Sequence, residues 1–289
     1  MVLSAEEEAF SEEDMSVLQT FASQAALAID TARMYSHEHD VASILQQSIL
    51  PEALPDFEEI EAASAYVPAG EESDIGGDYY DLLRAPDGTV WLAIADVCGK
   101  GVVAATKTSM IKYTVRALVG AGYCPRDVLA EVNRIVLETG ESSDIVTLWV
   151  GRLDLEAMEL SWSNGGHPPG IVRDIAGSIR TLPTTGPLLG AVRDVAYGEE
   201  TVALSIGDVI VLYTDGVTEA RAGSEFFGEE RVSGVVALGG TAEEVVQRLL
   251  TQVRRWVHGE LRDDIAILAV TVRGSEGLAD EACEGDSAT

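Results

Sequence analysis

The sequence predicts an α+β fold, in which strands and helices occur in separate groups along the chain. Short runs rich in Val, Ile, Leu and Tyr, bounded by Gly, Pro and Asp, indicate strands. The predicted order is strands, two helices, many strands, more helices and a last strand. A doubly wound sheet would alternate regularly, so this order favours sheets in the middle with helices outside.

A long helix is expected first, over residues 11–50. Ser11 is placed to cap it, acidic residues follow in its first turn, and Pro51 and Pro55 end it. A weak heptad stripe consists of Leu18, Phe21, Ala25, Ala28, Ala32, Tyr35 and Ala42, and is interrupted by His39 and Gln46. Two interpretations stay open: the helix packs on its own domain, or it is a signalling helix that dimerises.

The remaining elements follow from hydrophobic patterning and turn residues. Strands are expected at 62–69, 78–84, 89–96, 145–154, 159–166, 170–174, 208–215 and 265–272. Helices are expected at 102–119, 125–138, 229–238 and 242–258. Residues 274–289 are small, polar and acidic, which predicts a disordered tail.

Composition excludes several classes of function. Lys and Arg number 19 against 49 Asp and Glu, a net charge of −30, so neither nucleic acid nor an anionic membrane is an expected partner. The three cysteines (Cys98, Cys124 and Cys283) form no CxxC pair, and with four histidines a zinc site is not expected. No signal peptide opens the chain, and no apolar stretch approaches the about 20 residues of a membrane helix. A cytoplasmic protein is expected.

Aspartates stand where several predicted strands begin or end. Asp96 and Asp215 end apolar runs, Asp263 and Asp264 precede the last one, and Asp78 follows a glycine pair. If the last strand runs antiparallel to the strands that end at Asp96 and Asp215, these acids converge on one rim. Each aspartate alone is best interpreted as a turn residue. Together they favour a metal site, because clustered carboxylates repel one another unless a cation lies between them.

The donor chemistry indicates which cations fit. Oxygen ligands select Mg²⁺ or Mn²⁺, and two such ions bridged by one carboxylate lower the pKa of a shared water, so that no protein nucleophile is needed. Asp96 is the best bridging candidate, since Gly99 lets backbone approach the ions and a helix begins just after it. That helix N-terminus, with Lys100 nearby, is suited to attract a phosphate.

Seven segments occur in the order seen in metal-dependent type-2C (PPM) serine/threonine phosphatases. They are DIGGDYYD, AIADVCGKG, SNGGHPPG, TGPLLG, LYTDGVTEA, FFGEERV and RDDIAIL, and most resemble the bacterial SpoIIE-type or RsbU-type branch, which controls sigma factors. The resemblance covers roughly residues 45–272. It implies a four-layer α-β-β-α sandwich with two central, mostly antiparallel sheets and two Mn²⁺ or Mg²⁺ ions at one end.

The resemblance also implies roles for individual residues. Asp96 would bridge both metals and the Val97 carbonyl would bind one of them, while Asp215 and Asp263 hold the other side and Asp78 sits at the second ion. Supporting positions are Gly77, Gly99, Lys100, Asn164, His167, Gly216 and Asp264. Asp264 resembles an orienting neighbour. Asn164 and His167 are more readily interpreted as a turn between strands than as catalytic groups, and Asp81 and Glu219 as salt-bridge or turn residues.

Two positions depart from the animal and plant members of that family. Those members carry a His, a proposed general acid, two residues after the bridging Asp, and Cys98 stands there in this chain. A phosphate-binding Arg upstream has no clear match. Cys98 does not resemble the nucleophile of a Cys phosphatase, because no CxxxxxR loop surrounds it.

Residues 1–35 resemble the last piece of a GAF sensor domain. The expected organisation is therefore a GAF-like remnant with a linker helix at 1–50, a phosphatase domain at 51–273 and an acidic tail at 274–289. The expected activity is hydrolysis of phosphoserine or phosphothreonine on a STAS-type anti-sigma-factor antagonist, with a possible homodimer through helix 11–50. The alternatives are an inactive sensor or scaffold of the same fold and a phosphatase of a small phosphorylated molecule.

Overall fold

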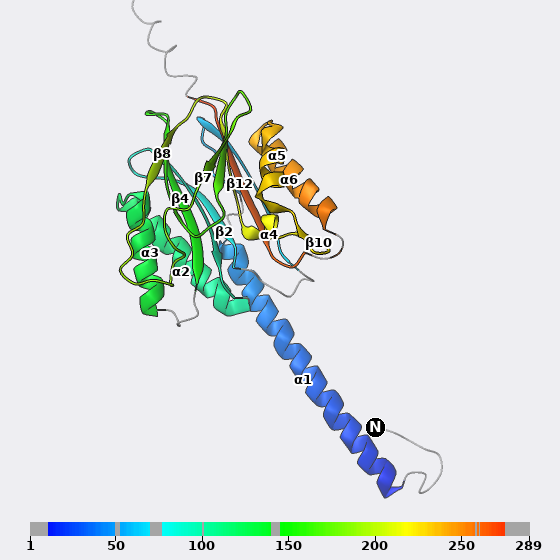
Figure 1. The fold of residues 1–289 in the computed structure, drawn as a ribbon. Helices are drawn as coiled ribbons and strands as arrows, with labels where there is room; N and C mark the ends of the chain where they lie inside the picture. Colours follow the sequence, from blue (N-terminus) through cyan, green and yellow to red (C-terminus); the bar gives the residue numbers. More distant parts are fainter. Residues whose placement is uncertain are drawn as a thin grey trace, which may run out of the picture.

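Two antiparallel sheets stacked face to face form the centre of the protein. The structure is a computed structural model and describes residues 11–49, 53–69, 77–99, 101–139, 145–257, 259 and 261–274. Helices cover the outer face of each sheet (Figure 1), so the predicted α+β fold with four layers is confirmed. No helix in these ranges is both long enough and apolar enough to cross a membrane.

Each sheet has five strands, all paired antiparallel. The first sheet has the order β1 (Ile60–Val67), β12 (Ile265–Val272), β9 (Val209–Tyr213), β6 (Gly170–Arg173) and β7 (Ile179–Leu182). The second sheet has the order β2 (Tyr79–Arg84), β3 (Val90–Val97), β4 (Val146–Asp154), β5 (Glu159–Gly165) and β8 (Glu200–Ala203).

Two helix pairs cover the sheets. Helices α2 (Gly101–Gly120) and α3 (Pro125–Thr139) pack on the second sheet, and α5 (Gly228–Ala237) and α6 (Ala242–Trp256) pack on the first. A capping box starts α6, because the Thr241 side chain accepts from the N–H of Glu244 while the Glu244 carboxylate accepts from the N–H of Thr241. A short helix α4 (Asp215–Thr218) and a small hairpin of β10 (Arg221–Ala222) and β11 (Glu225–Phe226) follow β9.

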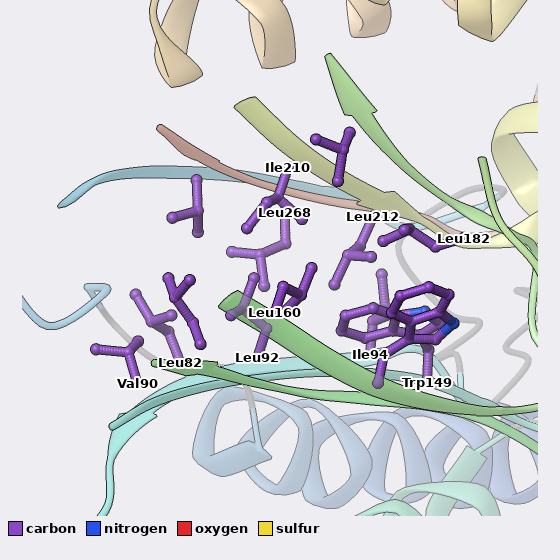
Figure 2. Packing of buried hydrophobic residues seen from close by; sticks show 14 of the residues in the cluster. Leu82, Val90, Leu92, Ile94, Trp149, Leu160, Leu182, Ile210, Leu212 and Leu268 are labelled. Carbon is purple, nitrogen blue, oxygen red and sulfur yellow. The ribbon is translucent and has the colours of Figure 1, made fainter. Parts of the chain in front are cut away.

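Alternation along the strands divides the side chains between the layers. In β3, Val90, Leu92 and Ile94 belong to the core between the sheets, whereas Trp91 and Ala93 pack towards α2 and α3. Trp149 from β4 and Leu212 and Leu268 from the opposite sheet join this inter-sheet core (Figure 2). Successive residues of a strand therefore point alternately into the core between the sheets and towards the helices.

Helix α1 (Glu12–Ile49) projects away from the sandwich and contacts it through α2 (Figure 1). Ser11 caps it as expected, because its hydroxyl accepts from the N–H of Asp14 (3.2 Å) and the Asp14 carboxylate accepts from the N–H of Ser11 (2.9 Å). The side chains of residues 11–34 are all exposed. Packing on its own domain is therefore wrong for this part of the helix. The side chains of Tyr35, His39, Ala42 and Gln46 lie outside what the structure describes.

Some elements differ from the sequence-based expectations. The strand expected at 208–215 ends at Tyr213, and Asp215 begins α4 instead. Strands β7, β8, β10 and β11 were not expected, because they have only two to four residues, too few to show an alternating pattern. The predicted tail lies almost entirely in 275–289, outside the described residues.

Candidate metal centre

One end of the inter-sheet space is lined by polar side chains in place of apolar ones. Asp96 follows Ile94 on the inward-facing side of β3, and Asp78 stands two residues before the inward-facing Tyr80. In the first sheet, Thr214 stands two residues after the inward-facing Leu212 of β9. Asp264 stands two residues before the inward-facing Ala266 of β12. We call this part of the space the acidic end. The alternation that builds the core thus also builds the polar layer.

A hydrogen bond across the two sheets supports this placement of Asp78. The Asp78 carboxylate, 4% exposed, accepts from the hydroxyl of Thr214 at 2.7 Å. That hydroxyl in turn accepts from the N–H of Ala266 at 2.9 Å. Thr214 therefore ties the start of the second sheet to two strands of the first and fixes the direction of the Asp78 carboxylate.

The aspartates at the acidic end oppose one another's ionisation. Burial raises the pKa of Asp78 well above its ordinary value, and the charges of Asp96, Asp264 and Asp215 raise it further. The pKa of Asp96 rises to about 7, through burial first and then through Asp215, Asp263 and Asp264. Strand β12 runs antiparallel to β9, and the convergence of these acids on one rim is confirmed.

Asp215 belongs to the same group but lies closer to solvent. Burial raises its pKa to about 6, and the charges of Asp263 and Glu219 add to that effect. Asp263 is exposed, and its Oδ1 accepts from the N–H of Asp264 at 3.0 Å. Glu219 ends α4, where its N–H donates to the Asp215 carbonyl at 2.7 Å, so its backbone forms the expected turn.

Two glycines allow the backbone segments of this site to approach closely. A Cβ at Gly77 would collide with the carbonyl oxygen of Val97, whose N–H donates to the Gly77 carbonyl at 3.3 Å. A Cβ at Gly216 would collide with the carbonyl oxygen of Asp264. Without these glycines the segment before β2 would move away from the end of β3, and α4 away from the start of β12. Gly77 and Gly216 thus act through backbone approach.

Asp264 is held by partners far from it in the sequence. Its two carboxylate oxygens accept from the N–H of Ala69 at 2.7 Å and from the hydroxyl of Tyr66 at 2.9 Å. Bonds to both oxygens hold the Asp264 carboxylate in one orientation. This geometry is consistent with an orienting neighbour of Asp263, whose Oδ1 accepts from the Asp264 N–H.

Asn164 and His167 form the turn that their spacing indicated. The Asn164 amide donates to the His167 carbonyl (3.0 Å) and accepts from the His167 N–H (2.8 Å). The His167 ring is 1% exposed, and its Nδ1 lies 2.8 Å from the hydroxyl of Thr147. Burial lowers the pKa of His167 to about 3, which keeps the ring neutral. Thr147 pairs with Asp96 across β3 and β4, so the ring lies one residue away from the acidic end.

The loop after β3 is described only in part. Cys98 is exposed, and Gly99 has a φ of 123°, a left-handed conformation that favours glycine. Lys100 lies outside the described residues, and α2 begins at Gly101. Asp81 is turned away from the site and pairs with Arg116 of α2, which matches its interpretation as a salt-bridge residue.

By chemistry, the acidic end fits hard divalent cations. Its side-chain donors are carboxylates and the Val97 carbonyl stands beside Asp96, which is the oxygen set that Mg²⁺ and Mn²⁺ accept. Within the described ranges, no three Asp, Glu, His or Cys side chains are arranged around a single ion position. Mg²⁺ usually binds proteins through one or two carboxylates and keeps several waters, so it does not require a closed cage of protein ligands.

Several residues of this site were not singled out from the sequence. Thr214, Thr147 and Tyr66 hold Asp78, His167 and Asp264 respectively. Thr214 had a usable signal, because it is the inward-facing position next to Asp215. Tyr66 had none, since it lies 198 positions from its partner.

A family model and several known proteins resemble this chain. The model for stage II sporulation protein E (SpoIIE) matches residues 86–273. The phosphoserine phosphatase RsbU of Bacillus subtilis (strain 168) is 29% identical over 236 residues, which are 81% of this chain and 69% of RsbU. The crystallised RsbU and RsbW domains of a Mycobacterium tuberculosis protein are 28% identical, with a TM-score of 0.65 over 75% of this chain and 62% of that one.

More distant structures share the fold alone. The SiaA-PP2C domain of Pseudomonas aeruginosa has a TM-score of 0.70 at 20% identity, over 85% of this chain and 99% of that domain. RsbX, crystallised in complex with magnesium, has a TM-score of 0.59 at 16% identity, over 76% of this chain and 98% of RsbX. The family match begins at residue 86, so the resemblance of residues 1–35 to a GAF domain stays a prediction.

Proposed function

The chain belongs to the stage II sporulation protein E (SpoIIE) family of serine phosphatases, and from this premise we propose that it hydrolyses phosphoserine or phosphothreonine on a regulatory protein. The observation that carries the proposal is the acidic end, where Asp78, Asp96 and Asp215 have raised pKa values at the edge of the inter-sheet core. Such a site costs stability and serves no packing purpose, which favours a functional role.

Two Mn²⁺ or Mg²⁺ ions, when bound, would supply Lewis-acid stabilisation of the phosphoryl group and a hydrolytic water of lowered pKa. Asp96 would bridge them, with the Val97 carbonyl on one side. Asp215 and Asp263 would hold one ion and Asp78 the other. Magnesium in the related RsbX crystal supports this class of ion.

The remaining residues position these ligands. Thr214 directs the Asp78 carboxylate by donating to it, and Tyr66 and Ala69 hold Asp264, whose N–H orients Asp263. Neutral His167 fixes Thr147 beside Asp96 without adding charge to the site. Cys98 is exposed, and no step requires it as a nucleophile.

The proposed partner is a phosphorylated STAS-type anti-sigma-factor antagonist, as the resemblance to RsbU-type phosphatases implies. The proposed regulatory surface is α1, which we infer to dimerise through its exposed apolar side chains. Met15 (56% exposed), Phe21 (65%), Leu27 (70%) and Met34 (74%) are among them. Light scattering on the wild type and on a Phe21→Glu, Ala28→Glu double variant tests this dimer, which equal masses would exclude.

The activity is tested with the purified chain, Mn²⁺ and two kinds of substrate. We expect hydrolysis of an aryl phosphate and faster hydrolysis of at least one phospho-STAS protein from the same genome. No hydrolysis of either substrate at any Mn²⁺ or Mg²⁺ concentration would identify an inactive sensor or scaffold. Hydrolysis of small phosphates without any phosphoprotein would identify a small-molecule phosphatase.

A further inference from the structure

A pocket of about 500 Å³ opens beside the acidic end, on the side of the proposed ligand Asp263. Gly216 and Asp263 line it, together with Arg221 and Gly223 from the β10–β11 hairpin and with Val257, Leu261 and Arg262 between α6 and β12. Pockets of this size usually hold a ligand larger than one phosphate group. A substrate bound at Asp263 would therefore extend into it with the residues on either side of its phosphoserine.

Two arginines give this pocket a basic wall. Arg221 belongs to β10, and Arg262 is the residue directly before Asp263. The Arg221 guanidinium lies over the ring of Phe226, 4.3 Å from its centroid, a contact that holds it in place and leaves its N–H donors available. Neither arginine forms a salt bridge with a residue in the described part of the chain, whereas Arg116, Arg134 and Arg231 do.

The acids of the pocket do not cancel this basic wall when the proposed site is loaded. Asp263 would be neutralised as a metal ligand, so the two arginines outnumber Glu219, the one remaining acid among the described residues that line the pocket. The two guanidiniums then remain as donors suited to carboxylates. They stand in a chain of net charge −30, which as a whole repels acidic peptides.

We propose that this pocket is a docking subsite for acidic residues that flank the phosphoserine of the protein substrate, with Arg221 and Arg262 binding their carboxylates. The proposal rests on the proposed phosphatase function and adds the sequence preference of the site. The subsite predicts a preference for acidic peptides. The net charge of −30 alone would predict the opposite, a preference for basic peptides.

The test uses two phosphoserine peptides that differ only in their flanks, Asp on both sides in one and Lys on both sides in the other. The measured quantity is the ratio of kcat/KM for the Asp peptide to that for the Lys peptide, at fixed ionic strength. This ratio removes any general change in the catalytic step. We expect a ratio of about ten or more for the wild type, since each guanidinium–carboxylate pair is charge-assisted and bidentate.

Variants assign this preference to the pocket. The Arg221→Gln, Arg262→Gln double variant should lower the ratio at least about fivefold, and Arg262→Glu should invert it. Arg180→Gln, which removes an exposed arginine of β7 that does not line the pocket, is the matched control and should keep the wild-type ratio. Circular dichroism verifies that each variant is folded.

The outcomes separate this proposal from the function it rests on. A wild-type ratio of one or below, or a ratio that the double variant retains, overturns the subsite. If the wild type hydrolyses neither the peptides nor an aryl phosphate, the proposed function fails. The subsite is then still decided by fluorescence anisotropy, since tighter binding of the Lys peptide than of the Asp peptide overturns it and the reverse supports it.

Discussion

Two aspartates three residues apart at the start of β2, both buried, meet opposite surroundings. Asp81 is fully buried, faces α2 and pairs with Arg116, whose Nε and Nη2 lie 2.6 and 2.8 Å from its oxygens. Asp78 is 4% exposed and faces the acidic end, where the charges of Asp96, Asp264 and Asp215 raise its pKa. The three-residue spacing on one strand sends the two side chains to opposite faces.

The difference separates a structural carboxylate from a functional one. The chain itself neutralises the charge of Asp81, so that residue joins α2 to the sheet. At the acidic end the neighbouring charges are of the same sign, and the cost of ionisation is offset only by a cation from outside. The central claim is that the acidic end is a cation site, and the predictions below test it against this comparison.

The largest effect is expected at Asp96, the proposed bridge. Asp96→Asn should lower kcat/KM for an aryl phosphate by more than about a hundredfold, because a neutral amide weakens two coordination spheres at once. The fold should persist, since the change removes a repelled charge. Asp174→Asn, in an exposed turn, is the control. Retention of more than about a tenth of the wild-type rate, ~1.4 kcal/mol of barrier, would rule out a bridging role.

Substituting the two compared aspartates should give opposite results. Asp81→Asn should lower the free energy of unfolding by about 1–3 kcal/mol, because Arg116 loses its charged partner but remains partly exposed. Its Mn²⁺ dependence should stay that of the wild type. Asp78→Asn should leave the metal-free protein at least as stable and raise the Mn²⁺ concentration for half-maximal rate about tenfold. Denaturant melts measure the free energy of unfolding, and Mn²⁺ titrations measure the metal dependence of the rate. Equal changes in both quantities for the two variants would contradict the comparison.

The pH dependence of stability should have a definite sign. In the folded state the pKa of Asp96 is about 7 and that of Asp215 about 6, both above the ordinary value of 3.8. Between pH 3.8 and 7 these two aspartates therefore bind more protons in the folded state than in the unfolded state. Their contribution to the stability of the metal-free protein is therefore full below about pH 4 and is lost as the pH rises to 7. Added Mn²⁺ should restore the melting temperature at pH 7.

The Asp96→Asn variant isolates this contribution from the remaining acids of the chain. Its melting temperature should fall less than that of the wild type between pH 5 and 7. An equal fall in both proteins would show that the acidic end does not cause the pH dependence.

The smallest effect is expected at Cys98. Cys98→Ser should keep kcat within about twofold of the wild type, because the residue is exposed and hydrolysis needs no protein nucleophile. Steady-state rates and mass spectrometry measure this. Loss of activity in a folded variant, together with a phosphocysteine trapped in the wild type, would replace the proposed mechanism.

The sequence predicted the acids of the site better than the residues that hold them. Asp96, Asp215 and Asp263 were recognisable because strand ends are marked by abrupt changes from apolar to polar residues. The Thr214–Asp78 and Tyr66–Asp264 bonds join residues 136 and 198 positions apart, and no local pattern encodes such contacts. The short edge strands β7 and β8 were not predicted for a related reason. Pairing with a neighbouring strand defines them more than their composition does.

Anomalous diffraction from crystals grown with Mn²⁺ tests the central claim most directly. The wild type should show two manganese peaks at the acidic end, both next to the Asp96 carboxylate and one of them next to the Val97 carbonyl. Crystals of Asp96→Asn should lose at least one of these peaks, and crystals of Asp81→Asn should keep both. Saturating Mn²⁺ with no peak at the acidic end, or with peaks only elsewhere, would contradict the account.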